Sequence, residues 1–253
     1  MLTALLLCLS TFALLALTGR LNFVVIEFPQ RDRRLVAALL LVGVLVVAVF
    51  LPTVAGSERE IDTDDLWFPS LFLGHVVLTA FVLTWWRLRP THESLRRFLL
   101  LDRVRLEDVG EGLWIGAMGW VFTILATAVL GLLVRDTAIV PAPSEIPEVM
   151  IWLANLPLPR KLLIIAVAMT VEEGFFRAFL QTRIGWIPSS VLFALGHAGY
   201  GLPMMLFSVF VISLVIGWTL RRRGRLLPCI VAHGVFDAIQ LLIVMPIAVR
   251  VIG

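Results

Sequence analysis

Long apolar segments recur along the whole chain, and they constrain its fold more than any other feature. A helix that crosses a bilayer needs about 20 consecutive apolar residues. Of the 253 residues, 60% are hydrophobic and 15% are charged, whereas soluble domains average about 25% charged residues. The pattern predicts an all-α, polytopic membrane helical bundle with about eight transmembrane helices. The predicted spans are residues 2–19, 35–55, 66–86, 112–134, 161–182, 187–199, 203–220 and 226–249.

The chain shows no internal repeat and no linker, so we expect one membrane domain over residues 1–253, of which residues 1–110 carry no recognisable motif. The first segment has no Lys or Arg ahead of its apolar core, which favours a retained helix over a signal peptide. The sixth segment is short and is interrupted by Pro188, and a broken helix at membrane depth must be buried inside a bundle. Residues 141–158, rich in proline, predict an outer re-entrant or surface segment.

Loop charge predicts the orientation of the helices. Residues 20–34, residues 87–111 and the turn "RRRGR" after the seventh span are rich in arginine, and the alternate loops are acidic. Because basic loops stay in the cytoplasm, this alternation places both termini outside. Arg160 and Lys161 are the exception, since they fall on the predicted outer side.

Ionisable side chains are rare inside the predicted spans and gather in the second half of the chain. Burying such a group at membrane depth costs roughly 2.5–3.5 kcal/mol, so function is the default hypothesis for it. At 1.5 Å per residue, the polar groups of spans five, six and eight lie about 10–17 Å below the inner surface, where they can meet. The ionisable residues are Glu172, Glu173, Arg177, His197, His233 and Asp237, with His75 on the third span.

Helical spacing suggests different tasks for these side chains. Glu173 and Arg177 stand at i and i+4 with the acid first, the favourable order for an ion pair. Glu172 points about 100° away from Glu173 and is therefore the less neutralised carboxylate, which suits a general base. His233 and Asp237 are again four residues apart, so the carboxylate can orient the imidazole.

A carboxylate with two histidines, and no nucleophilic Ser or Cys on the same faces, indicates an activated water. Glu172 would take the proton from a water that His197 holds. His233, backed by Asp237, would donate to the oxyanion of the attacked carbonyl. The residues therefore predict hydrolysis of a peptide or ester bond inside the bundle.

Three short motifs also resemble those of a known family. "EEGFFR", "FALGH" and "HGVFD" are similar to the motifs EExxxR, FxxxH and Hxxx(N/D) of the CAAX proteases and bacteriocin-processing enzymes, a family of intramembrane glutamic endopeptidases. The resemblance covers about residues 160–240. It implies that Glu172 and His197 activate the water and that Glu173 and Arg177 hold the scaffold.

The third motif departs from the CAAX branch of that family at its last residue. The resemblance implies that His233 and residue 237 form the oxyanion hole, but Asp237 stands where that branch has Asn. A carboxylate cannot donate a hydrogen bond unless it is protonated. His233 is then the expected donor, and a direct role for Asp237 is open. His75, alone on its span, is expected to be a satisfied interior histidine, with a supporting role behind the site as the alternative.

Other functions fit part of the pattern. Glu172, His197 and His233 would be an adequate zinc set, but the sequence has no HExxH and the three residues come from separate helices, so no cofactor is expected. A structural ion pair is the alternative for Glu173 and Arg177. A transporter or a bacteriocin self-immunity binder would also bury such groups, although transporters usually show repeats.

The expected partners are a peptide or protein substrate in the membrane and the lipid bilayer. Nucleic acid is not expected, because the basic residues sit in short loops rather than in one patch. The expected location is a bacterial cytoplasmic membrane. A C-terminal sorting signal, a peptide leader and a membrane-protein tail all stay open as substrates.

Overall fold

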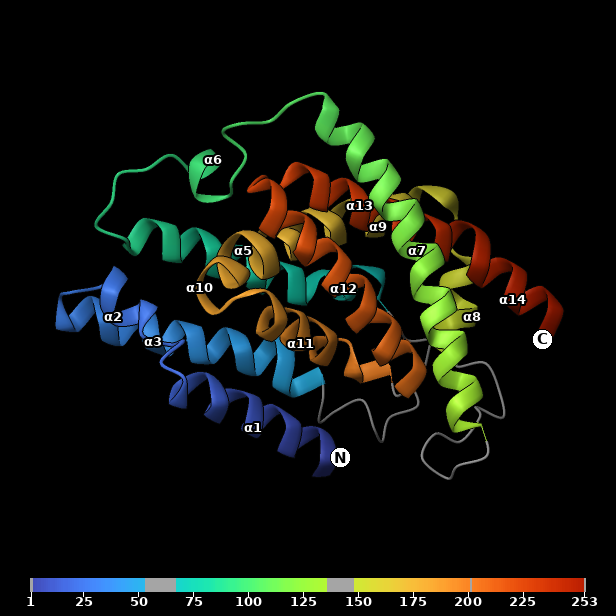
Figure 1. Ribbon diagram of the computed structural model, residues 1–253, viewed down its shortest axis with the longest axis horizontal. Coiled ribbons are helices and arrows are strands. Elements are labelled where there is room, and N and C mark those ends of the chain that lie inside the picture. The colour runs from blue at the N-terminus through green and yellow to red at the C-terminus, as the bar shows by residue number, and fades with distance from the viewer. Residues whose placement is uncertain (1, 53–66, 136–147, 201, 253) are drawn as a thin grey trace.

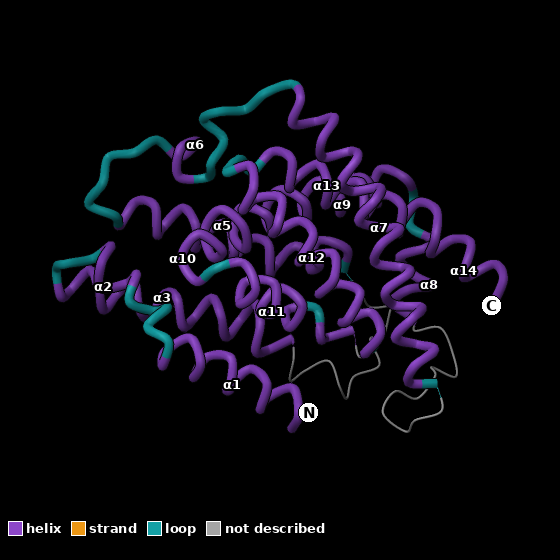
Figure 2. Tube along the Cα trace, in the orientation of Figure 1, coloured by secondary structure: helices purple, strands orange, loops and turns teal. Residues whose placement is uncertain are grey.

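The computed structural model describes residues 2–52, 67–135, 148–200 and 202–252, which form helices joined by turns (Figure 1). No described residue lies in a β-strand (Figure 2). The α-helices are α1 (Leu2–Leu17), α2 (Phe23–Glu27), α3 (Arg31–Leu45), α5 (Leu73–Leu88), α6 (Leu95–Phe98), α7 (Glu107–Val134), α8 (Glu148–Asn155), α9 (Leu158–Glu172), α10 (Thr182–Ile184), α11 (Trp186–Gly196), α12 (Pro203–Arg223), α13 (Leu227–Ile239) and α14 (Met245–Ile252). Segments of π-helix or 3₁₀-helix adjoin them at η1 (Val46–Phe50), η2 (Phe68–Phe72), η3 (Glu173–Gln181), η4 (Ala198–Tyr200) and η5 (Gln240–Val244).

The all-α membrane bundle that the sequence predicts is confirmed. Each predicted span is helical over its described part. Three of the eight predicted spans correspond to α1, to the short α11, and to the helix formed by α9 and η3. The apolar stretch of this last helix is interrupted by charged side chains. The number of crossings stays a prediction. Five described helices are long and apolar enough to cross a membrane, namely Arg31–Phe50, Phe68–Leu88, Glu107–Val134, Pro203–Arg223 and Leu227–Val251.

The helix formed by α9 and η3 lies in the middle of the bundle, in contact with α5, α11, α12 and α13. Every residue of η3 is buried. An aromatic cluster fixes η3 against α5, because the Phe179 ring packs edge-on at 4.9 Å from Phe81 and 5.0 Å from Trp85. Such edge-to-face pairs add stability beyond the area that they bury. The N-terminal helices are thus part of one core with the motif-bearing helices.

Glycines allow the helices around the site to approach closely. A Cβ atom at Gly112 of α7 would lie 2.5 Å from the side chain of Val231 on α13. On the other side of α13, a Cβ at Gly234 would lie 2.4 Å from the sulfur of Met169 on α9. At Gly112 the next atom is a backbone oxygen of α13, that of Pro228 at 2.8 Å, so this glycine sets how near α13 comes to α7. At Gly234 the neighbour belongs to a flexible methionine side chain, which fills the space that the glycine leaves.

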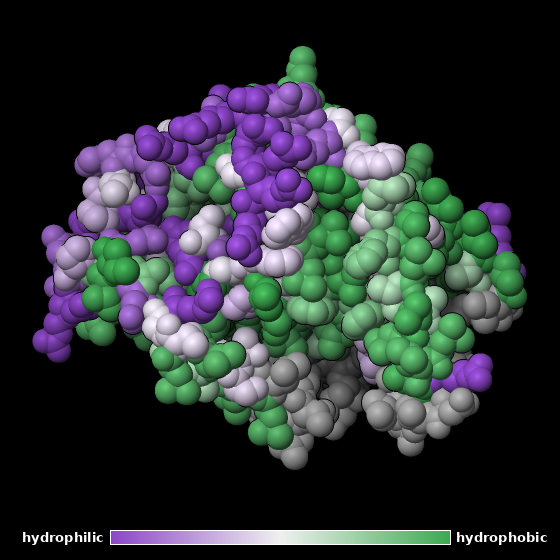
Figure 3. All heavy atoms as spheres, in the orientation of Figure 1, coloured by the Kyte–Doolittle hydropathy of each residue, from purple (hydrophilic) through white to green (hydrophobic). Residues whose placement is uncertain are grey.

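The arginine-rich loops meet at one end of the bundle. Glu27, at the end of α2, lies 2.8 Å from Arg183 in α10, and Arg225 lies 2.6 Å from Asp108 in the first turn of α7. Hydrophilic side chains gather at this end, around the loop that carries α6, while apolar side chains cover α7 (Figure 3). The acidic loops fall almost wholly outside the described residues, so the orientation in the membrane stays a prediction.

The two basic residues that depart from the loop-charge pattern both have partners. The ammonium of Lys161 is buried and donates to the carbonyl of Ala154, 2.7 Å away in the last turn of α8. The guanidinium of Arg160 lies 5.0 Å from the ring centre of Phe68. The first contact holds α8, the described helix of the predicted outer segment, against the start of α9. The second holds the start of α9 against η2.

Candidate active site

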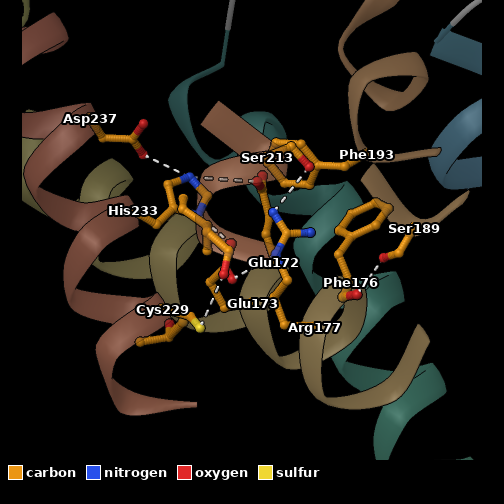
Figure 4. Close-up of polar contacts among 12 residues, drawn as sticks. Glu172, Glu173, Phe176, Arg177, Ser189, Phe193, Ser213, Cys229, His233 and Asp237 are labelled. Carbon is orange, nitrogen blue, oxygen red and sulfur yellow. Dashed lines mark hydrogen bonds and ion pairs between the residues drawn. The ribbon is translucent and has the colours of Figure 1, made fainter. Parts of the chain in front are cut away.

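The first motif lies where an α-helix becomes a π-helix. The sequence predicted a helical span over residues 161–182, and the structure is helical there, with a π-helical segment, η3, that begins at Glu173. A π-helix has i→i+5 hydrogen bonds, is rare, and is frequent at functional sites. Two neighbouring helices hold it in place: the buried hydroxyl of Ser189 on α11 donates to the carbonyl of Phe176 at 2.6 Å (Figure 4), and Gln181 donates to the carbonyl of Gly217 on α12 at 2.7 Å.

Glu172 is the carboxylate around which three histidines gather. Its Oε1 atom lies 3.1 Å from Nε2 of His75 on α5. Its Oε2 atom lies 3.9 Å from Nε2 of His197, just after α11, and 3.9 Å from Nε2 of His233 on α13. The structure therefore brings together the three motif residues that the sequence proposed for the chemistry. It also places His75 beside Glu172, in the supporting position that the sequence offered as the alternative for this residue.

Glu173 points to a different set of partners. Its Oε2 atom lies 3.2 Å from Nε of Arg177, so the predicted ion pair is present. Its Oε1 atom lies 2.9 Å from Nδ1 of His233 (Figure 4). Arg177 in turn donates to the hydroxyl of Ser213 on α12 at 3.2 Å, and its guanidinium lies 4.9 Å from the ring centre of Phe193.

His233 lies between carboxylates on both sides of its ring. Its Nδ1 atom faces Glu173, while its Nε2 atom lies 3.3 Å from Oδ2 of Asp237 and 3.9 Å from Oε2 of Glu172. The predicted contact between His233 and Asp237 is present. Glu173 is nevertheless the closer partner, and sequence reasoning missed it because 60 residues separate the two.

His197 is held by its own helix. Its Nδ1 atom lies 2.9 Å from the carbonyl oxygen of Phe193, four residues earlier. A carbonyl only accepts, so Nδ1 carries the hydrogen of this bond, and in the neutral ring Nε2 is then an acceptor. That acceptor is the atom that faces Glu172.

Exposure divides the cluster into two parts. The side chains of Glu173 and Arg177 are fully buried, at 0%. Those of His75 and His197 are 21% and 23% exposed, and that of Glu172 is 13% exposed. The ion pair is thus fully buried, whereas the side chains of Glu172, His75 and His197 are partly exposed, although Oε2 of Glu172 is itself a buried atom.

Metal binding was the chemical alternative for Glu172, His197 and His233. A zinc ion needs its nitrogen and oxygen ligands at about 2.0–2.2 Å. Among the described residues, no group of three or more His, Cys, Asp or Glu side chains could hold a metal ion. Independence from metal stays a prediction, to be tested by chelation.

Comparison with known proteins relates the same part of the chain to a family. Residues 154–239 match the family described as type II CAAX prenyl endopeptidase, Rce1-like. The UPF0177 protein YxdF of Lactococcus lactis subsp. lactis (strain IL1403) is 26% identical over 166 residues, which cover 63% of this chain and 86% of that protein. No solved structure matches the chain significantly. All three motifs lie inside the matched region, and His75 lies outside it.

Proposed function

Because the chain belongs to the CAAX protease-like family of intramembrane proteases, we propose that it hydrolyses a peptide bond with a water molecule activated by Glu172 and His197. The observation that carries this proposal is the convergence of Glu172, His197 and His233 from three helices, with 3.9 Å from the Glu172 oxygen to each imidazole. Glu172 and His197 are polar and partly exposed at the predicted membrane depth, where a purely structural role would favour full burial and pairing.

The geometry suits a shared water. Two acceptors 3.9 Å apart can both contact one water at normal hydrogen-bond lengths of about 2.7–3.0 Å. Glu172 takes one proton of this water as the water oxygen attacks the carbonyl carbon of the substrate. The proton then passes from Glu172 to the amine that leaves when the C–N bond breaks, so the carboxylate is regenerated.

His233 would stabilise the oxyanion as an imidazolium, the form in which both ring nitrogens carry a hydrogen. Glu173 accepts from Nδ1 at 2.9 Å, so the N–H of Nε2 is directed toward the space beside Glu172 and Asp237. A donor fixed in advance at the position where negative charge develops is an effective form of catalysis. In this scheme the buried pair of Glu173 and Arg177 orients His233 rather than touching the substrate.

The substrate would be a membrane-associated or exported protein, because the site lies within a helical bundle at membrane depth. A C-terminal sorting signal and a peptide leader are the candidate segments. The bilayer is the second partner, and a bacterial cytoplasmic membrane is the proposed location.

The test is the isosteric change Glu172→Gln in protein reconstituted in lipid nanodiscs. A quenched-fluorescent peptide library of mixed sequence would supply a substrate that the unchanged enzyme cleaves. Loss of a general base is expected to reduce turnover about 10²–10⁴-fold. Glu107→Gln is the matched control, because Glu107 is an exposed carboxylate at the start of α7. Wild-type cleavage by Glu172→Gln would overturn the proposal.

A further inference from the structure

Among the described residues, His75 is a polar partner of Glu172 from outside the three motifs. It stands in the first turn of α5, 97 residues before Glu172, and its Nε2 atom lies 3.1 Å from Oε1. The hydroxyl of Thr79 donates to the His75 carbonyl at 2.8 Å, and the Phe72 ring lies 6.1 Å from the imidazole. The aromatic cluster between α5 and η3 fixes the distance between the two helices. The contact is therefore part of the packed bundle.

The two oxygens of Glu172 have different surroundings. Oε1 is engaged by His75, whereas Oε2 has no hydrogen-bond partner among the described residues and stands 3.9 Å from both motif histidines. The last torsion of a glutamate is broad and roughly two-fold. Nothing intrinsic to the side chain therefore decides which oxygen faces His197. A hydrogen bond to one oxygen does decide it.

The chemistry of the contact assigns the hydrogen. A carboxylate oxygen only accepts, so Nε2 of His75 must donate, and a lone pair at that position would repel Oε1. The bond fits both stages of the proposed reaction. When Glu172 is an anion, His75 stabilises the charge on Oε1. When Oε2 has taken the proton of the water, Oε1 is a carbonyl-like oxygen that still accepts from His75.

We propose that His75 is a positioning residue that holds Oε1 of Glu172 and so reserves Oε2 for the water between Glu172 and His197. This inference rests on the proposed function, because it gives Glu172 the role of base. It makes α5, from the part of the chain without motifs, a contributor to the catalytic geometry.

Three substitutions separate positioning from packing. Glutamine places its amide N–H near the position of Nε2 in histidine, whereas asparagine reaches only as far as Nδ1. His75→Gln can therefore keep the bond to Oε1, and His75→Asn cannot, although both are polar. His75→Ala removes the ring altogether. His92→Gln, at an exposed histidine in the loop before α6, is the matched control.

Turnover, KM and thermal unfolding would be measured in nanodiscs with the quenched-fluorescent peptide selected by the wild-type enzyme. Losing a hydrogen-bonding partner behind a catalytic group typically costs about 10–100-fold in activity. His75→Asn and His75→Ala should lose turnover to this extent with KM unchanged, and His75→Gln should recover most of it. The infrared carboxylate band of Glu172, identified as the band absent from Glu172→Gln, should shift in His75→Asn and not in His75→Gln.

The outcomes separate this inference from the proposed function. Full turnover and an unshifted band in His75→Asn, with Glu172→Gln inactive, would overturn the role of His75 alone. An equal loss of turnover in all three His75 variants that parallels their unfolding temperatures would also overturn the role of His75 alone. Retained cleavage by Glu172→Gln would instead overturn the proposed function.

Discussion

Replacing Arg177 by alanine should destabilise the protein far more than replacing Glu172 by glutamine. Arg177 and Glu173 are both fully buried, with 3.2 Å between Nε and Oε2. Without the guanidinium, the remaining partner of Glu173 among the described residues is the His233 ring. Breaking a buried ion pair by removing one member costs about 3–5 kcal/mol. Because both groups are shielded from water, solvent screening gives no reason to reduce that figure.

The same change also removes packing, and the two effects can be separated. Arg177 lies over the Phe193 ring and donates to Ser213, so alanine leaves a cavity as well as an unpaired carboxylate. Arg177→Met fills most of that volume without the charge. If the carboxylate is the cause, Arg177→Met should remain destabilised. The double change Glu173→Gln with Arg177→Met should then regain stability, because replacing both members of a buried pair is often close to neutral.

Thermal unfolding followed by tryptophan fluorescence gives the measurement. At about 2–4 °C per kcal/mol for a chain of roughly this size, Arg177→Ala should unfold about 6–20 °C below the wild type. Glu172→Gln should unfold near the wild-type temperature, because the amide oxygen can still accept from His75. Equal unfolding temperatures for the two variants would refute the division of labour between the two carboxylates.

Three further predictions concern topology, metal and the third motif. Single cysteines at Ser57 and Ser94 should be labelled from opposite sides of the membrane, and labelling of both from outside would contradict the orientation. A strong chelator should leave activity unchanged, whereas loss restored by zinc alone would contradict the glutamate–water mechanism. His233→Ala should lower turnover about 10²–10³-fold. The turnover of Asp237→Asn should stay within about tenfold of the wild-type value, because Glu173 still holds the His233 ring at 2.9 Å. A loss of turnover as large as that of His233→Ala would contradict this prediction.

The sequence predicts the helices well because bilayer length and loop charge are local properties. Each predicted span is helical over its described part. The meeting of Glu172, His197 and His233 could also be predicted, because all three stand at similar depths on their helices. Depth along a helix follows directly from counting residues, and it needs no knowledge of which helices are neighbours.

Contacts that depend on which helices are neighbours could not be predicted. His75 is isolated in an apolar span, and nothing in the sequence says that α5 packs beside α9. The π-helical stretch from Glu173 is likewise invisible, since the residues of η3 would also suit an α-helix. The bond between Glu173 and His233 depends on how closely α13 approaches α9. Where the two helices meet, the Met169 side chain fills the space that Gly234 leaves, and the sequence does not show that these two residues are neighbours.

The two adjacent carboxylates, Glu172 and Glu173, have different partners and therefore different roles. Glu173 has Arg177 on one oxygen and His233 on the other, so its charge is matched inside a sealed pocket. Glu172 has a single histidine on Oε1, and its buried Oε2 has no hydrogen-bond partner among the described residues. A carboxylate paired as fully as Glu173 would be a poor base, because removing its charge would disrupt its partners. Because successive residues of a helix point about 100° apart, the two side chains face different partners and can take one task each.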